Sequence, residues 1–311
     1  MLADKTHDNA FGLYKPPVTN LGVLNLLPLE LLQEVLSQVD VYTFLIFRLV
    51  NRQANGTVES VPAYRAIIKY AWNAVRGILA IGTGRWITVN TLYEKLCTAE
   101  CEQCGYFGGY LYLLTCKRVC FVCVSRNTLY LPLRPSDASR RFGLSRELVK
   151  TLPCMRAVPG TYAPHGGEVP NSLLVDTESA LRTGITTHGS VEAMGQFISE
   201  AYRPRIYNTR AAAAERLRSA APRPIPFTTD YPQRWAENAN RFVAIARVPC
   251  LDAKSQQVEW GFHCIGCKKS RFKVRHYRRK YTTASFRDHL EQFGDIKDER
   301  HSRISTLSNL L

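Results

Sequence analysis

Apolar residues recur at three- and four-residue spacing through residues 24–52, which is the pattern of an amphipathic helix. The apolar face of the first predicted helix consists of Leu31, Leu32, Val35, Leu36 and Val39. Pro28 suits the first turn of this helix, and Asp40 suits the N-cap of a second helix that runs to Val50. The pattern therefore predicts two short, apolar helices that are joined tightly near the N-terminus.

Helical periodicity continues through residues 60–96. It predicts one helix that is interrupted at Gly77 and ends near Gly82, and a second helix over residues 88–96. Further helices are predicted over residues 140–150, 191–200, 208–221 and 284–293, and a loop over residues 161–170. His165 and His188 have no carboxylate or second ligand nearby in sequence, so we expect both to be surface histidines.

Strand patterns are short and lie beside cysteines. Residues 110–114 form an aromatic and aliphatic run, and residues 242–262 alternate as expected for a β-hairpin. The whole pattern predicts an α+β fold, with a helical N-terminal region, a small hairpin in the cysteine-rich stretch and a mixed C-terminal region.

Six of the ten cysteines fall between residues 97 and 123. Cys101/Cys104 and Cys120/Cys123 form two C-x-x-C pairs at a spacing typical of four thiolates around one zinc ion. Gly105 permits the tight turn that aims both sulfurs of the first pair at one point. The stretch therefore predicts a structural, zinc-ribbon-like site, because an all-sulfur ligand set is normally closed to substrate. The alternative is a set of buried or disulfide-bonded cysteines.

Other cysteines leave the metal count open. Cys97 and Cys116 each precede a C-x-x-C pair by four residues and could compete for the metal, although we expect them to be packed or spare thiols. A RING finger is excluded, because it needs eight ligands interleaved around two zinc ions.

A third pair, Cys264/Cys267, is a candidate half-site for a second zinc ion. Its partners would come from His276, His289 or His301, because no cysteine follows. The first choice is Cys264, Cys267 and His289, and we expect the tail beyond Lys297 to be frayed.

The formal charge is 41 − 26 = +15, which favours acidic partners such as nucleic acid, a phosphoinositide surface or an acidic protein. Residues 268–280 contain eight Lys or Arg and no acidic residue, and Phe272 and Tyr277 are interleaved with these basic residues. This run could hold phosphates or stack on bases, or it could be a solvated basic segment or an import signal. No signal peptide and no membrane-spanning apolar run is visible, so we expect the protein in the cytoplasm or nucleus, without a membrane partner.

The order of residues in the N-terminal helices resembles an F-box. The matching positions are Leu27-Pro28, Glu30-Leu31-Leu32, Val35-Leu36, Val39-Asp40, Phe44 in the place of a usual leucine, and Val50-Asn51-Arg52. Over residues 24–165, the combination of these helices with the C-x-x-C ribbon resembles a family of fungal F-box proteins.

The resemblance implies a docking module for a Skp-family adaptor that links the chain to a cullin-based ubiquitin ligase. It also implies that the adaptor-facing residues are Leu27, Pro28, Leu31, Val35 and Phe44. The alternative is that all of these residues belong to the core of an ordinary helical hairpin.

These patterns divide the chain into five regions. They are a flexible arm (1–20), an F-box (21–66), a helical region with the four-cysteine zinc module (67–165), a linker with helices (166–240), and a β-hairpin, C-x-x-C and basic C-terminal region (241–311).

Two functions are compatible with these regions. The first is an F-box substrate receptor that binds an unknown protein client through the rest of the chain, which zinc stabilises. The second is a zinc-containing nucleic-acid-binding protein that uses residues 268–280. We expect no enzyme activity, because no G-x-S-x-G, P-loop, H-E-x-x-H or spaced acid pair occurs.

Overall fold

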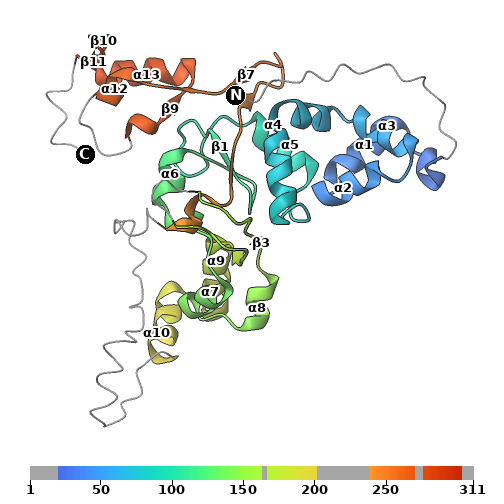
Figure 1. The fold of residues 1–311 in the computed structure, drawn as a ribbon, viewed down its shortest axis with the longest axis horizontal. Coiled ribbons are helices and arrows are strands. Elements are labelled where there is room, and N and C mark those ends of the chain that lie inside the picture. The colour runs from blue at the N-terminus through green and yellow to red at the C-terminus, as the bar shows by residue number, and fades with distance from the viewer. Residues whose placement is uncertain (1–19, 163–166, 202–237, 270–275, 303–311) are drawn as a thin grey trace.

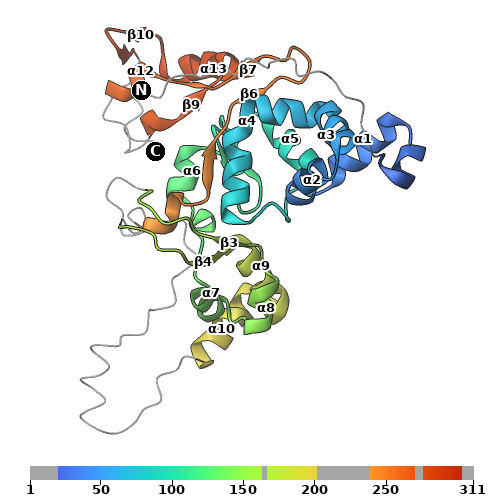
Figure 2. The ribbon, with the colours of Figure 1, turned by 45° about the vertical axis from the view of Figure 1, so that its right-hand side comes forward.

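The computed structural model describes residues 20–162, 167–201, 238–269 and 276–302. It confirms the predicted α+β fold. Figures 1 and 2 show the N-terminal helices on one side of a small central sheet, with a helical unit and a C-terminal unit on opposite sides of that sheet. Within the described ranges, no helix combines the length and the apolar character needed to cross a lipid bilayer.

The N-terminal region is entirely helical. Its elements are the 3-10 helix η1 (Gly22–Leu26), α1 (Leu29–Gln38), α2 (Val41–Arg48), α3 (Arg52–Ser60), α4 (Pro62–Ile81) and α5 (Val89–Cys97). Asp40 caps α2 as predicted, because its carboxylate accepts a hydrogen bond from the backbone N–H of Thr43 at 2.9 Å. Asn51 caps α3 in the same way, which ends the predicted second helix at Arg48 and starts a third one that the pattern did not separate.

Helix α4 carries the chain from the N-terminal helices to the cysteine-rich hairpin. It ends at Gly82, as predicted, with this glycine in the left-handed conformation (φ 78°). The interruption lies at Ala71 (φ −134°) and not at Gly77, where it was predicted. A Cβ atom on Gly77 would lie 2.6 Å from Leu113 Cδ1, so the glycine allows the helix to approach the hairpin closely.

The central sheet has three strands in the order β2-β1-β5. Strands β1 (Tyr110–Tyr112) and β2 (Lys117–Val119) form the predicted antiparallel hairpin, and β5 (Ile245–Arg247) pairs antiparallel with the other edge of β1. One continuous hydrophobic core runs from Leu32 of α1 through this sheet to Leu251. The N-terminal helices and the hairpin therefore share a core.

The helical unit has a second, smaller core centred on Phe142 and Met194. Its elements are α6 (Phe121–Arg126), η2 (Thr128–Tyr130), α7 (Pro135–Phe142), α8 (Arg146–Thr151), β3 (Cys154–Arg156), β4 (Leu173–Val175), α9 (Thr177–His188) and α10 (Val191–Ala201), where α6 and η2 connect the hairpin to the unit. The helix predicted over residues 140–150 is two helices, because Gly143 adopts a left-handed conformation between them (φ 63°).

His188 is half-buried, and its ring lies 4.5 Å from that of Phe197. His165 and the helix predicted over residues 208–221 lie outside the described residues.

The C-terminal unit is small and irregular. Its elements are η4 (Ala239–Phe242), β6 (Cys250–Leu251), β7 (Val258–Glu259), β8 (Phe262–His263), α12 (Ile265–Lys269), η5 (His276–Arg278), β9 (Lys280–Tyr281), α13 (Thr283–Phe293), β10 (Ile296–Lys297) and β11 (Arg300–His301), where η4 and β6 lead in from the central sheet. The single hairpin predicted over residues 242–262 is wrong in detail, because β5 pairs with β1 and only β6 and β7 pair with each other. The prediction that the tail frays beyond Lys297 is wrong for Arg300 and His301, since β11 pairs with β10. Residues 303–311 lie outside the described residues.

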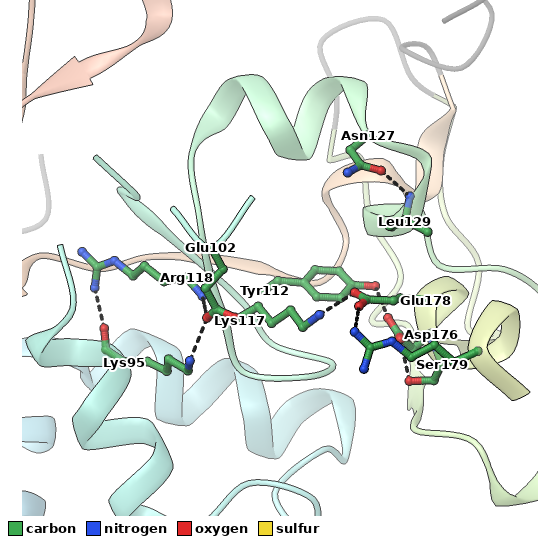
Figure 3. A network of polar contacts seen from close by, with 11 residues as sticks. Lys95, Glu102, Tyr112, Lys117, Arg118, Asn127, Leu129, Asp176, Glu178 and Ser179 are labelled. Atoms are coloured by element: carbon green, nitrogen blue, oxygen red, sulfur yellow. Dashed lines mark hydrogen bonds and ion pairs between the residues drawn. The ribbon is translucent and has the colours of Figure 1, made fainter. Parts of the chain in front are cut away.

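Neighbouring residues of β2 tie the sheet to two different parts of the chain (Figure 3). The guanidinium of Arg118 donates to the backbone carbonyl of Lys95 in α5 at 3.0 Å, while the ammonium of Lys117 pairs with Glu178 of α9. Beside this ion pair, the Tyr112 hydroxyl donates to Asp176 at 3.2 Å, and Asp176 also caps α9. The hairpin is thus the element on which the other units are assembled.

Candidate metal centres and adaptor-binding face

The first candidate centre is formed by the two C-x-x-C pairs of the hairpin. A turn at Cys101 is closed by hydrogen bonds from the N–H groups of Cys104 (3.2 Å) and Gly105 (2.8 Å) to the Cys101 carbonyl, and Gly105 has a φ of 74°. On the other side, Cys120 is the N-cap of α6, and its sulfur accepts from the N–H of Cys123 at 3.4 Å. Each pair is therefore shaped by its own short turn, as the spacing predicts.

The four sulfurs of Cys101, Cys104, Cys120 and Cys123 lie within 4.8 Å of one another. The sulfurs of Cys104 and Cys120 are 3.7 Å apart. A tetrahedron of thiolates with metal–sulfur bonds of about 2.3 Å has edges of about 3.8 Å, so the arrangement fits a tetrahedral metal site. No disulfide joins any of the ten cysteines.

Hydrogen bonds within this group distribute the protons unequally. Those from Cys104, Cys120 and Cys123 hold the pKa of the Cys101 thiol far below its usual range. Hydrogen bonding to Cys101 raises the pKa values of Cys120 and Cys123 well above theirs. Deprotonating all four thiols together therefore requires a strong positive charge among them, which a divalent cation supplies.

Cys97 and Cys116 stand outside both metal-compatible groups of the described residues. The side chain of Cys116 is buried, and burial raises its pKa to about 12. Burial also raises the pKa of Cys97. Because neither sulfur lies within a metal-compatible group, neither thiol competes for the metal in this arrangement.

The second candidate centre combines Cys264 and Cys267 with His289 of α13 and His301 of β11, all four of them buried. The sulfur of Cys264 lies 3.1 Å from Nε2 of His301, and the sulfur of Cys267 lies 3.3 Å from Nε2 of His289. The two Nε2 atoms are 3.2 Å apart. Tetrahedral zinc with sulfur and nitrogen ligands requires separations of roughly 3.3–3.6 Å. The group is slightly more compact than that, so a small outward shift of the ligand atoms would let it hold the ion.

Among the three histidines that the sequence offered, the structure brings two to this centre. His289 was the first choice, and His301 supplies the fourth ligand that the prediction lacked. The side chain of His276 lies outside the description. Nδ1 of His301 is 2.8 Å from the carbonyl oxygen of Gly294, a contact that orients Nε2 toward the sulfurs.

The N-terminal helices expose one apolar face and bury another. On α1, Leu32 and Leu36 point into the core, whereas Leu31 and Val35 are about half exposed, at 55% and 51%. Leu27 and Pro28 are exposed just before this helix. Four of the predicted adaptor-facing residues are therefore accessible, and their contact with an adaptor stays a prediction.

Phe44 is a correction to the predicted adaptor-facing residues. Its side chain is only 1% exposed, and its ring lies 5.1 Å from that of Tyr64 in the core. Because Tyr64 belongs to α4, Phe44 packs against that helix and cannot contact a partner in this conformation. The larger ring in the place of a usual leucine fills the core instead.

We therefore expect Phe44→Leu to lower the free energy of unfolding by about 1 kcal/mol, because a volume-reducing change between apolar residues leaves a small void. Affinity for a Skp-family adaptor should stay within about twofold of wild type, since no exposed group changes. Urea unfolding and adaptor titration measure the two effects separately. A large loss of affinity at unchanged stability would return Phe44 to the binding face.

Other exposed apolar residues extend this surface. We define the N-terminal apolar face as Val23, Leu26, Leu27, Leu29, Leu31, Val35, Ile46, Leu49 and Val50. The side-chain amide of Gln53 donates to Asn25 at 2.7 Å and holds η1 against the start of α3, near Leu49 and Val50. Leu26 and Leu49 are 82% and 77% exposed. Exposed apolar surface of this extent is typical of an interaction site.

Comparison with known proteins identifies these helices. The sequence model of the F-box domain matches residues 24–65, which extend from η1 into the first turn of α4. No curated protein and no solved structure matches the chain significantly. The wider resemblance to fungal F-box proteins stays a prediction. The chain therefore carries an F-box domain at residues 24–65, which supports a general role as a substrate adaptor of ubiquitin ligases, and its described residues include two Cys/His groups that can hold metal ions.

Proposed function

We propose that the protein is the substrate receptor of a cullin-based ubiquitin ligase and performs no covalent chemistry itself. In this role, the N-terminal apolar face binds a Skp-family adaptor, and the rest of the chain presents a protein client. The observation that supports the proposal is that the F-box helices leave Leu31, Val35 and their neighbours uncovered while Leu32 and Leu36 complete the core. A helical hairpin that served only as a cap would bury both sets.

We further propose that both Cys/His groups hold zinc. Four thiolates, or two thiolates with two imidazoles, are ligand sets that suit zinc, and a closed four-ligand site suits a structural role. The first centre would stabilise the hairpin that carries the other units, and the second would stabilise the C-terminal unit. Mass spectrometry of the intact folded protein should then find two zinc ions per chain.

A double substitution on α1 tests the adaptor proposal. Leu31→Asp with Val35→Asp places two charges on the exposed side of the helix, one turn apart. Desolvating them against an apolar partner should weaken adaptor binding by about 100-fold or more. Binding is measured by titrating the purified adaptor against the zinc-loaded full chain.

The matched control is Val158→Asp with Leu173→Asp, which changes two half-exposed apolar residues outside the F-box domain. This variant should bind the adaptor as wild type does. If the α1 variant keeps wild-type affinity while it remains folded, the proposed docking face is wrong.

A further inference from the structure

A pocket of about 360 Å³ lies where the cysteine-rich hairpin meets the C-terminal unit. The hairpin side contributes Phe107, Tyr110 and Phe121. The C-terminal unit contributes Lys268, Arg278 and Lys280, each from a different element. One side of the pocket lies next to the first metal-compatible group and the other next to the second. The pocket therefore exists only while the hairpin and the C-terminal unit are both folded and in contact.

The charge of this pocket is uniformly positive. No carboxylate lines it, and in the described ranges none forms an ion pair with Lys268, Arg278 or Lys280. The nearby Glu299 pairs with Lys269 instead. The cations are therefore available for an anionic partner.

Lys280 is held in the pocket at an electrostatic cost. Its ammonium donates to the Trp260 carbonyl at 2.6 Å, which fixes its position. Burial, and then the charges of Arg247 and Arg118, lower its pKa to about 8. An anion bound beside Lys280 would offset both effects.

Arginines cover Phe121, which lines the pocket, and Tyr106, which is the neighbour of the lining residue Phe107. The guanidinium of Arg278 lies 4.7 Å from the ring centre of Phe121, and Phe242 stacks on the same ring at 5.8 Å. Arg279 covers Tyr106 in the same way at 4.0 Å. Arg278 and Phe242 thus occupy ring faces of Phe121 on which a nucleobase could otherwise stack. Nε of Arg278 donates to the Tyr277 hydroxyl at 3.2 Å, and its terminal amino groups remain as donors to oxyanions.

We propose that this pocket binds an acidic segment of a protein partner. Its carboxylates pair with Lys268, Arg278 and Lys280, and an apolar side chain beside them contacts Phe107 and Tyr110. A pocket of this size holds a few side chains and does not extend along a nucleic-acid backbone. That the acidic segment belongs to a client of the ubiquitin ligase rests on the proposed function. That the pocket binds an acidic segment does not depend on the proposed function.

The test measures fluorescence anisotropy of labelled probes with the zinc-loaded full chain. The probes are a short Asp/Glu peptide with a central Phe, its Asn/Gln counterpart, a neutral peptide with one phosphoserine, and an oligo-dT strand. We expect the acidic peptide to bind most tightly and the Asn/Gln peptide not to bind. Lys268→Ala with Arg278→Ala should weaken binding roughly tenfold or more, since two charge-assisted contacts are lost.

The matched control, Lys69→Ala with Arg76→Ala, removes the same charge from the exposed surface of α4, where neither residue lines the pocket, and should leave binding unchanged. Equal losses in both variants, or no binding by wild type, would overturn the proposal. Tighter binding of the phosphoserine peptide or of oligo-dT would also overturn it, in favour of a phosphate or a nucleic-acid site.

Further measurements separate the causes of failure. Metal content and melting temperature show whether the double variant folds, and Arg278→Gln alone, which leaves the residue next to Cys267 intact, should still weaken peptide binding. The α1 variant Leu31→Asp with Val35→Asp should bind the acidic peptide normally. Loss of adaptor binding and loss of peptide binding are thus independent results.

Discussion

Cys267→Ser is expected to remove one metal ion per chain and to unfold the C-terminal unit, while the remainder of the chain stays folded. The buried hydrophobic cluster of this unit consists of Cys264, Cys267 and Tyr281, and two of these three belong to the second candidate metal centre. Such a cluster cannot offset the conformational entropy of ordering the unit. Under the proposed zinc assignment, metal binding, at about 10–16 kcal/mol for structural zinc, would supply the missing free energy.

Hydrogen exchange together with metal analysis measures this effect. Amides of α12, α13 and β11 should lose protection, and the zinc count should fall from two to one. The control is Cys154→Ser, which changes a half-buried thiol outside both metal-compatible groups and should preserve both ions. Retention of two ions and full protection in Cys267→Ser would contradict the assignment of this centre.

Arg118→Met should lower the free energy of unfolding by about 3–5 kcal/mol, because its guanidinium is fully buried among carbonyl oxygens. It donates to Gly108, to Lys95 at 3.0 Å, to Pro249 at 2.8 Å and to Val248 at 3.3 Å. Methionine keeps most of the apolar contacts but leaves these carbonyl oxygens without a donor. Each carbonyl that no water reaches lowers the free energy of unfolding by about 1–3 kcal/mol. The loop of the first metal centre, α5 and the approach to β6 would separate.

The matched control is the preceding residue, Lys117, whose side chain leaves β2 toward α9 (Figure 3). Lys117→Met loses one partly exposed ion pair and should cost less than about 1 kcal/mol. Urea unfolding followed by tryptophan fluorescence compares the two variants. Equal, small shifts of the midpoint would show that the carbonyl cluster is satisfied without the guanidinium.

The sequence was most informative where structure is local. The C-x-x-C pairs, the Asp40 cap and the stop at Gly82 each depend on a few consecutive residues, and each appears where it was predicted. Helix α9 was missed, because its threonines and glycine have low helix propensity, and its Asp176 cap is an isolated signal.

The fourth ligand of the second centre could not be chosen from the sequence. His301 reaches the site through a two-residue hairpin whose turn residues, Asp298 and Glu299, both have positive φ (48° and 60°). Such turns are normally signalled by Asn-Gly or a similar pair, which this chain lacks there. The burial of Phe44 could not be predicted from the sequence either. Periodicity shows which residues share a helix face, but it does not show which face packs against the core.

Strand β5 completes the central sheet although about 125 residues separate it from β2. During synthesis, the ribosome must therefore release residues 245–247 before Tyr110–Tyr112 can acquire its second neighbour. Until then, the nascent hairpin presents an open strand edge, which is a site for mispairing with other chains. Loading the first centre with metal early, while the ribosome is still translating, would hold that hairpin in register until its last strand arrives.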